Sequence, residues 1–293
     1  MAFDFTEFSG KVRVLDGAWG TSLQEKGLPA GGAPELWNTL NPSSVEYVAR
    51  GYVEAGSEAI LTNTFGANRF VLASHGEGER TAELCEAAAA ISRKAAEGTD
   101  VKLFGSIGPS GKIVMTGDVS TDELLAAFTE PAEALAFGGV DAIVLETFNE
   151  LDELKIALDA VKSACELPVV ACMTFASGPE KTATMMGNKP ADLAKAAREG
   201  GADAIGANCG AGPKHYVTVT GLLAEATDLP VWIKPNAGLP EVRNRKTYWP
   251  TGPEEFASYI RPIVQAGATF VGGCCGTTAE HIAAVRKAVD ELG

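Results

Sequence analysis

The sequence is poor in basic residues and in histidine, and both shortages narrow the classes of protein to which it can belong. It has 24 lysine and arginine residues against 38 aspartate and glutamate residues, a formal net charge of −14 at pH 7. An acidic surface repels phosphate backbones and anionic lipids, so we expect neither a nucleic acid partner nor a membrane partner. The 293 residues include only three histidines, which disfavours a zinc or iron hydrolase, because such a site needs histidine and carboxylate ligands.

Long apolar segments are also missing. No apolar run reaches the roughly 18 residues of a membrane-spanning helix. The first residues, Met1–Phe8, contain acidic side chains where a secretory signal needs cations, and no apolar stretch follows them. These absences predict a cytoplasmic protein. In that reducing compartment, six cysteines indicate metal binding, catalysis or plain burial rather than a disulfide framework.

A helix that ends in glycine and is followed by a buried strand recurs four times, at residues 54–60, 137–143, 199–205 and 265–271. The glycine is typical of a left-handed helix end, and the apolar pair after it is typical of a strand buried on both faces. Four further apolar segments bring the number of predicted strands to eight: Val12–Leu15, Val101–Ile107, Leu167–Phe175 and Leu229–Lys234.

Helical patterns alternate with these strands, and several begin with proline, which the first turn of a helix tolerates. The alternation of eight strands and eight helices predicts a closed (β/α)8 TIM barrel, and the lack of a linker-like segment predicts a single domain, residues 1–293. The predicted helices are Pro42–Ala55, Glu77–Glu97, Thr121–Phe137, Glu150–Ala164, Pro190–Glu199, Pro213–Ala226, Pro253–Gln265 and Thr278–Leu292.

Three cysteines stand where predicted strands end. Cys209 follows the sixth strand, and Cys274 and Cys275 follow the eighth. The carboxyl ends of the strands of a parallel barrel meet at one mouth, so the three thiols can converge and hold one Zn²⁺ with a coordination position free. Such a zinc ion deprotonates a bound thiol and keeps it nucleophilic. Reactive thiol chemistry and plain burial are the alternatives, and burial is the expected state of the other three cysteines, Cys85, Cys165 and Cys172.

Two acidic residues also end predicted strands. Glu146 closes a continuous apolar strand, where a carboxylate needs a cation or a donor, so it could bind an ammonium group. Asp16 precedes Gly17 and Ala18, whose exposed backbone N–H groups could receive a carboxylate, although a plain tight turn explains the glycine equally well. The three histidines are interpreted as surface or helix-capping residues. The loop 243–249, rich in cations and aromatics, is either a lid, a partner-docking segment or a solvated loop.

With these residues identified, nearly the whole chain resembles the homocysteine S-methyltransferase family, a family of zinc-dependent barrels. The forms of the motifs are closest to the homocysteine module of cobalamin-dependent methionine synthase. The motifs that carry the resemblance are Leu15-Asp-Gly-Ala-Trp-Gly-Thr21, Leu61-Thr-Asn-Thr-Phe65, Gly105-Ser-Ile-Gly-Pro109, Leu145-Glu-Thr147, Gly206-Ala-Asn-Cys-Gly210, Lys234-Pro-Asn-Ala-Gly238 and Gly272-Gly-Cys-Cys-Gly-Thr-Thr278.

The resemblance implies zinc-dependent methylation of L-homocysteine to L-methionine. It implies that the homocysteine thiolate becomes the fourth zinc ligand and that Glu146 holds the ammonium group. It further implies that the backbone around Asp16, Gly17 and Ala18 receives the carboxylate with Asn63 nearby. The implied metal ligands are Cys209, Cys274 and Cys275, with Asn236 in the open position before substrate arrives.

The resemblance leaves the methyl donor open. The 293 residues contain no folate or cobalamin module, so we expect the methyl group from a separate methyl-corrinoid protein carrying methylcobalamin. A small onium donor such as betaine, dimethylsulfoniopropionate or S-methylmethionine is the alternative, because aromatic side chains favour such cations. A module that binds thiols or a corrinoid partner without turnover is the alternative from another functional class. The aromatic candidates are Trp19, Phe65, Phe175, Tyr248 and Trp249.

Overall fold

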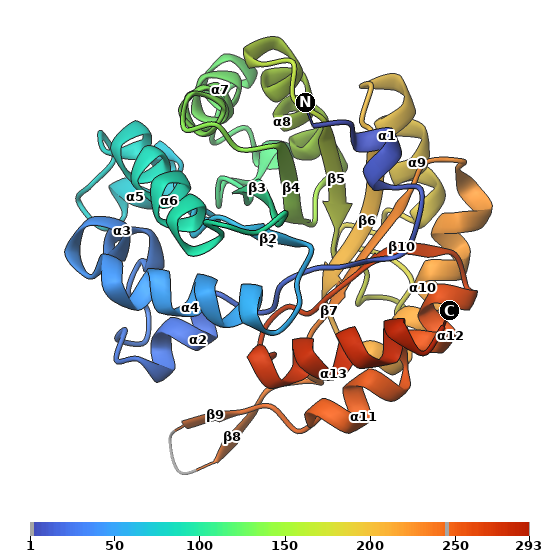
Figure 1. Ribbon diagram of the computed structural model, residues 1–293. Helices are drawn as coiled ribbons and strands as arrows, with labels where there is room; N and C mark the ends of the chain where they lie inside the picture. Colours follow the sequence, from blue (N-terminus) through green and yellow to red (C-terminus); the bar gives the residue numbers. More distant parts are fainter. Residues whose placement is uncertain (1–2, 244–245, 293) are drawn as a thin grey trace.

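The computed structural model describes residues 3–243 and 246–292, and it places eight parallel strands around one axis (Figure 1). The strand order is β1-β10-β7-β6-β5-β4-β3-β2, and a parallel bridge from Leu15 to Ala59 brings β1 beside β2, so the sheet nearly closes. The prediction of a TIM barrel is confirmed. The strands are β1 Arg13–Val14, β2 Ala59–Leu61, β3 Lys102–Ile107, β4 Ala142–Phe148, β5 Val169–Met173, β6 Ala204–Cys209, β7 Val231–Pro235 and β10 Ala268–Val271.

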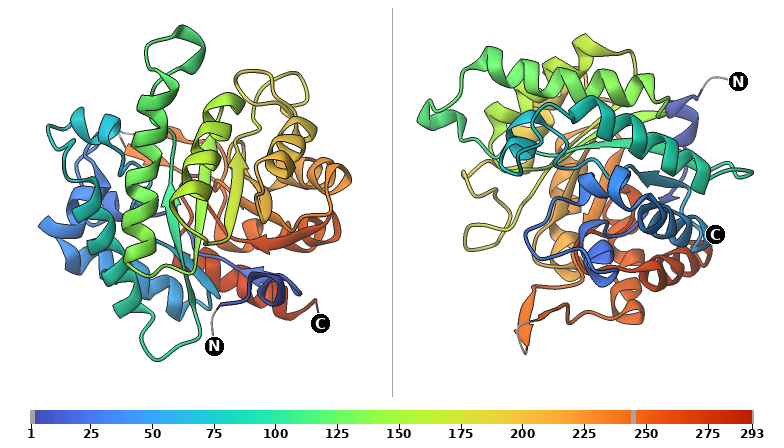
Figure 2. Two further views of the ribbon diagram at one scale, coloured as in Figure 1. Left: turned by 90° about the horizontal axis from the view of Figure 1, so that it is seen from above. Right: turned by 90° about the vertical axis from the view of Figure 1, so that its left-hand side faces the viewer.

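Helices surround the sheet on its outside (Figures 1 and 2). None of the helices in the described part of the chain is both long enough and apolar enough to cross a membrane. The longer helices are α4 Pro42–Glu54, α6 Thr81–Ala95, α7 Thr121–Phe137, α8 Leu151–Ala164, α9 Pro190–Glu199, α10 Pro213–Ala226 and α13 Ala279–Asp290. The shorter ones are α1 Phe5–Phe8, α2 Gly20–Glu25, η1 Pro34–Leu36, α3 Trp37–Leu40, α5 Arg69–Ala73, η2 Val114–Thr116, α11 Pro253–Ser258 and α12 Ile260–Gln265.

Two predicted helices differ from the structure. The helix predicted from Glu77 begins only at Thr81, because the backbone N–H groups of Glu77 and Arg80 bond in turns that follow α5. The helix predicted over Pro253–Gln265 is divided into α11 and α12 at Tyr259. Pro262 has no N–H with which to continue a helix from α11, whereas the first turn of a new helix accepts it.

The long connection after β7 contains a β-hairpin that the sequence analysis did not predict. Strands β8 Glu241–Arg243 and β9 Lys246–Tyr248 pair antiparallel, and the hairpin projects from the barrel in Figure 1. Of the predicted loop 243–249, Arg243 ends β8 and residues 246–248 form β9, whereas Asn244 and Arg245 lie outside the described residues.

A cluster of aromatic rings fills one part of the barrel interior. Phe104 of β3 stacks on Trp232 of β7 with ring centroids 5.6 Å apart, and Phe270 of β10 lies 5.4 Å from Trp232. Helix α1 adds Phe5 and Phe8 to the same cluster. This helix lies beside the amino end of β1, where the Arg13 guanidinium donates to the carbonyl of Phe8 over 2.6 Å. The carboxyl ends of the strands are left for polar residues.

Candidate metal and amino-acid site

The three strand-end cysteines meet in space. Cys209 ends β6, Cys274 and Cys275 follow β10, and their three sulfur atoms lie within 4.8 Å of one another. The Cys209 and Cys274 sulfurs are 3.1 Å apart. Cys209 adopts a left-handed backbone with φ 64°, which is uncommon outside glycine. Among the described residues, no other cluster of histidine, cysteine or acidic side chains has this metal-binding geometry.

The remaining cysteines and the histidines lie outside this cluster. Cys85 in α6 and Cys172 in β5 are fully buried, and Cys165 at the end of α8 is partly buried. His281 caps α13, since its ring nitrogen accepts a hydrogen bond from the backbone of Thr278, while His215 bonds the carbonyl of Lys181. The interpretation of His281 as a capping residue is confirmed.

The three neighbouring thiols shift one another's pKa values in opposite directions. Hydrogen bonds from Cys209 and Cys274 stabilise the Cys275 thiolate and lower its pKa to about 4. Hydrogen bonds to Cys274 and Cys275, together with burial, raise the pKa of Cys209 well above its usual value. A thiolate surrounded by two further thiols suits a soft divalent cation, because metal binding releases the remaining protons.

A cavity of about 290 Å³ opens beside the cysteines, a size near the lower end of small-molecule sites. All three cysteines line it. The other lining residues include Gly17, Ala18, Trp19, Asn63, Phe65 and Glu146. The cavity therefore brings the candidate metal ligands and several of the predicted amino-acid-binding residues together.

Glu146 follows four fully buried apolar residues of β4 and is itself 7% exposed. Ser106 of β3 donates to its Oε1 over 2.5 Å, and the side chain of Asn208 donates to its Oε2 over 3.3 Å. Burial raises the pKa of Glu146 to about 7, although the charge of Lys234 and the bond from Ser106 oppose the rise. An ammonium group beside this buried carboxyl group would stabilise its ionised form.

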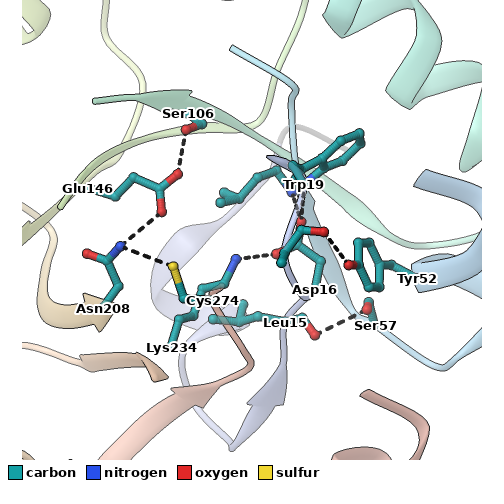
Figure 3. A network of polar contacts seen from close by, with 12 residues as sticks. Leu15, Asp16, Trp19, Tyr52, Ser57, Ser106, Glu146, Asn208, Lys234 and Cys274 are labelled. Carbon is teal, nitrogen blue, oxygen red and sulfur yellow. Dashed lines mark hydrogen bonds and ion pairs between the residues drawn. The ribbon is translucent and has the colours of Figure 1, made fainter. Parts of the chain in front are cut away.

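A buried ion pair lies next to this carboxylate (Figure 3). Lys234 of β7 is 2% exposed and donates to Oδ1 of Asp16. The other oxygen of Asp16 accepts from the backbone N–H of Leu61 over 2.7 Å and from the indole of Trp19 over 2.8 Å. Burial lowers the pKa of Lys234, but the neighbouring carboxylates of Asp16 and Glu146 outweigh it and raise the pKa. Lys234 thus remains a cation within the pocket wall.

The predicted carboxylate-binding residues lie at or beside the cavity. Asp16 is fully buried and is not among the residues lining the cavity. Gly17 is tightly enclosed, since a Cβ there would lie 2.8 Å from the ring of Tyr52 and 2.9 Å from Thr277 Oγ1. The N–H of Ala18 donates to Thr277 Oγ1 over 3.2 Å. Asn63 lines the cavity, but both protons of its amide are used, by Pro34 O and Asn38 Oδ1.

Asn236, predicted as a fourth ligand, is buried between the two cysteine segments. Its backbone N–H donates to the carbonyl of Cys209, and the next residue, Ala237, donates to the carbonyl of Cys275. Its side-chain nitrogen donates to Gly210, whereas its Oδ1 is buried with no hydrogen-bond partner. A buried acceptor without a donor costs free energy, which a cation can offset. Three thiols and an unpaired amide oxygen are a donor set that fits zinc.

Three further residues contribute to the site although no role was predicted for them from the sequence: Lys234, Ser106 and Asn208. A role for Lys234 could have been predicted from the sequence, because a lysine near the end of an apolar strand needs an anionic partner. Ser106 and Asn208 also lie near strand ends, but their side chains are small or neutral. Their presence in the sequence therefore does not predict an interaction with a particular residue.

The chain is similar to known proteins along most of its length. A family model described as "Homocysteine S-methyltransferase" matches residues 13–289. The methionine synthase of Mycobacterium tuberculosis is 35% identical over 97% of this chain, and that of Mycobacterium leprae is 33% identical over 95%. The chain spans about a quarter of the length of these two relatives, 25% and 24% respectively.

Among solved structures, the chain is similar to the metallated form of the homocysteine methyltransferase MmuM from Escherichia coli. The TM-score is 0.80 with 22% sequence identity, and the match covers 97% of this chain and 98% of that chain. At this identity the likeness concerns the fold.

Proposed function

Since the chain belongs to the homocysteine S-methyltransferase family, we propose that it transfers a methyl group to the sulfur of L-homocysteine and releases L-methionine. The observation that carries this proposal is the convergence of Cys209, Cys274 and Cys275 on the same cavity as Glu146. The cavity thus offers a thiol-binding metal centre and an ammonium-binding carboxylate to one small amino acid.

The three cysteines are proposed to hold one zinc ion, with Asn236 Oδ1 as the fourth ligand before substrate arrives. Zinc supplies Lewis acidity that lowers the pKa of a bound thiol, so that the substrate sulfur is a thiolate at neutral pH. The protein keeps its own sulfurs close together by the left-handed turn at Cys209 and by backbone bonds from the end of β7 to both cysteine segments.

The rest of the amino acid is proposed to be held by polar groups around the cavity. Glu146 pairs with the ammonium group, and its orientation is maintained by the donor Ser106. The carboxylate lies against the backbone of Gly17 and Ala18, near Asn63, and Lys234 balances the negative charge of Asp16 behind it. Fixing both ends of the substrate directs its sulfur toward the methyl donor.

The methyl donor is proposed to be methylcobalamin on a separate corrinoid protein, by analogy with the motif forms shared with methionine synthases. A small onium donor is the second candidate, because Trp19 and Phe65 line the cavity and aromatic faces attract such cations. Of the other aromatic candidates, Phe175 is fully buried and Tyr248 belongs to the β8–β9 hairpin. We place the reaction in the cytoplasm, where thiols stay reduced.

The metal assignment is tested with Cys209→Ala and with Cys85→Ala as the matched control, since Cys85 is a buried cysteine in α6 outside the cluster. We expect Cys209→Ala to lose stoichiometric zinc and methyl transfer with its circular dichroism spectrum unchanged. Cys85→Ala should retain both zinc and transfer. Full zinc content and activity in a folded Cys209→Ala protein would refute the assignment.

The donor is tested by incubating the zinc-loaded protein with homocysteine and one candidate donor at a time. The donors are methylcobalamin, betaine, dimethylsulfoniopropionate, S-methylmethionine and S-adenosylmethionine, and the product measured is methionine. Transfer from methylcobalamin supports the corrinoid proposal. Rapid transfer from an onium donor, with none from methylcobalamin, would show that the onium compound is the donor instead. Binding of homocysteine without methionine from any donor or corrinoid protein would instead indicate a non-catalytic module.

A further inference from the structure

The side chain of Asn208 lies between the candidate metal ligands and the candidate ammonium-binding carboxylate (Figure 3). Asn208 immediately precedes Cys209 at the end of β6, and it is fully buried. In the figure its amide bridges Glu146 on one side and Cys274 on the other. None of the roles proposed above for metal or substrate includes this residue.

The orientation of the amide follows from its partners. The backbone N–H of Thr147 can only donate, and it donates to Oδ1 of Asn208 over 2.8 Å. The nitrogen Nδ2 therefore lies on the other side of the amide, where it faces four atoms that can accept a hydrogen bond. These are Thr147 Oγ1 at 2.6 Å, Glu146 Oε2 at 3.3 Å, and the sulfurs of Cys209 and Cys274 at 3.9 Å each.

Thr147 is held by this amide in an unfavourable conformation. Its φ is 67°, a left-handed conformation that is strained for a β-branched residue. Asn208 binds both its N–H and its hydroxyl, so the amide closes around Thr147. Thr147 Oγ1 also lies 3.8 Å from Cys209 Sγ, within reach of a weak hydrogen bond.

The amide of Asn208 therefore faces the sulfur cluster and holds one oxygen of Glu146, while Ser106 holds the other. Donors next to metal-bound ligands orient them and spread their negative charge. We propose that Asn208 is a positioning residue, which couples the geometry of the three-cysteine cluster to that of the ammonium-binding Glu146. This inference rests on the function proposed above.

The inference is tested with Asn208→Asp and Asn208→Ala. The aspartate keeps an acceptor for the N–H of Thr147 but replaces the donor that faces Glu146 and the sulfurs. We expect either variant to weaken zinc binding about 10- to 100-fold, the range typical of such outer residues. The KM for homocysteine should rise about tenfold or more, with a smaller change in kcat, because the ammonium receptor is displaced.

Zinc affinity is measured by competition with a chelator, and the environment of the sulfurs by the thiolate-to-cobalt absorption band of the Co²⁺-substituted protein. The matched control is Asn149→Ala. The amide of Asn149 donates to the carbonyl of the same Thr147 over 3.3 Å, but it has no bond to Glu146 or to the sulfurs among the described contacts. This control should keep the zinc affinity, the cobalt spectrum and the KM of the parent protein.

The double variant Asn208→Ala/Thr147→Gly distinguishes a positioning role of Asn208 from a role that only supports the turn at Thr147. Glycine adopts the left-handed conformation without strain, so the turn no longer needs the amide. Under the inference, the double variant regains thermal stability while zinc affinity and KM stay impaired. Recovery of all three would overturn the inference, since Asn208 would then only support the turn.

Failure of the inference and failure of the proposed function give different results. If the parent protein binds neither zinc nor homocysteine, the proposed function is wrong. If the parent binds both and Asn208→Asp matches it within twofold in zinc affinity and in KM, Asn208 is not a positioning residue and the proposed function stands.

Discussion

Glu146 is a carboxylate almost completely removed from water, and its proposed partner is the ammonium group of the substrate. Glu146→Gln keeps the shape and the donor from Ser106 but cannot carry a negative charge. A hydrogen bond to a charged group contributes about 1.5–3 kcal/mol, so we expect the KM for homocysteine to rise at least about tenfold. The zinc content should not change, because Glu146 is outside the sulfur cluster.

The chain offers a matched control for this substitution. Glu153 in α8 is also buried and also accepts from a serine, Ser110, over 2.5 Å, but it does not line the cavity. Glu153→Gln should therefore leave the KM unchanged. Steady-state kinetics over a range of homocysteine concentrations separates the variants, and equal KM values for the two would argue against an ammonium-binding role for Glu146.

At the scale of elements, α1 closes the barrel interior with aromatic side chains. The ring of Phe5 lies 5.7 Å from that of Phe270 and 6.3 Å from that of Phe104. Phe5→Ala removes most of these contacts and leaves a cavity, and we expect the free energy of unfolding to fall by about 3 kcal/mol. Zinc stoichiometry should remain at the parent value, since α1 contributes no metal ligand.

Phe137→Ala is the control for this prediction, because Phe137 at the end of α7 is 82% exposed. Its free energy of unfolding should lie within about 0.5 kcal/mol of the parent. Urea unfolding followed by tryptophan fluorescence measures both variants. An equally small effect of Phe5→Ala would show that α1 is attached without contributing to the stability of the barrel.

At the scale of the whole molecule, Glu58 ties the first strand to helix α13. It accepts from Arg13 of β1 over 2.7 Å, from Arg286 of α13 over 2.9 Å, and from the N–H of Val14 over 3.1 Å. Burial alone would raise the pKa of Glu58, but the bonds from Arg13 and Val14 and the two arginine charges hold it below its usual value. The folded protein thus favours the ionised carboxylate.

A carboxyl group with a lowered pKa stabilises the fold above its unfolded-state pKa of about 4.3, and this contribution is lost as the pH falls through the lower folded-state pKa. We expect Glu58→Gln to reduce the free energy of unfolding at pH 7 by about 1–2 kcal/mol. The difference from the parent should shrink as the pH is lowered below about 4. Urea unfolding at a series of pH values measures it.

Glu199→Gln is the comparison, since Glu199 is exposed and its Oε1 lies as far as 4.0 Å from Lys195 Nζ. Such a surface pair contributes little. A Glu58→Gln protein that matches the parent at pH 7, or that differs from it equally at every pH, would contradict the assigned role of Glu58.

Much of the barrel could be predicted from the sequence because its signals are local. The repeated glycine before an apolar strand and the proline at helix starts each depend on a few neighbouring residues, and they placed helices such as Thr121–Phe137 and Pro190–Glu199 at their observed bounds. The convergence of Cys209 with Cys274 then followed from the topology of a parallel barrel.

The missed features depend on contacts between distant residues or on backbone conformation. The pairing of Lys234 with Asp16 joins residues 218 positions apart, and no pattern of neighbouring residues in the sequence predicts it. The position of the Asn208 amide depends on the left-handed backbone of Thr147, a non-glycine residue that sequence rules place elsewhere. The packing of α1 against Phe270 likewise appears only once the barrel has formed.

The pairing of β1 with β10 also sets the order of events during protein synthesis. Arg13 and Val14 have Phe270 and Val271 as their partners in the sheet, and the ribosome makes those partners about 250 residues later. At about 5–20 residues per second, the first strand waits roughly 10 to 50 seconds for its neighbour. During that interval the adjoining aromatic segment, which includes Phe5 and Phe8, lacks its contacts with Phe270. Until Phe270 is made, this aromatic segment offers an apolar surface that a chaperone can bind.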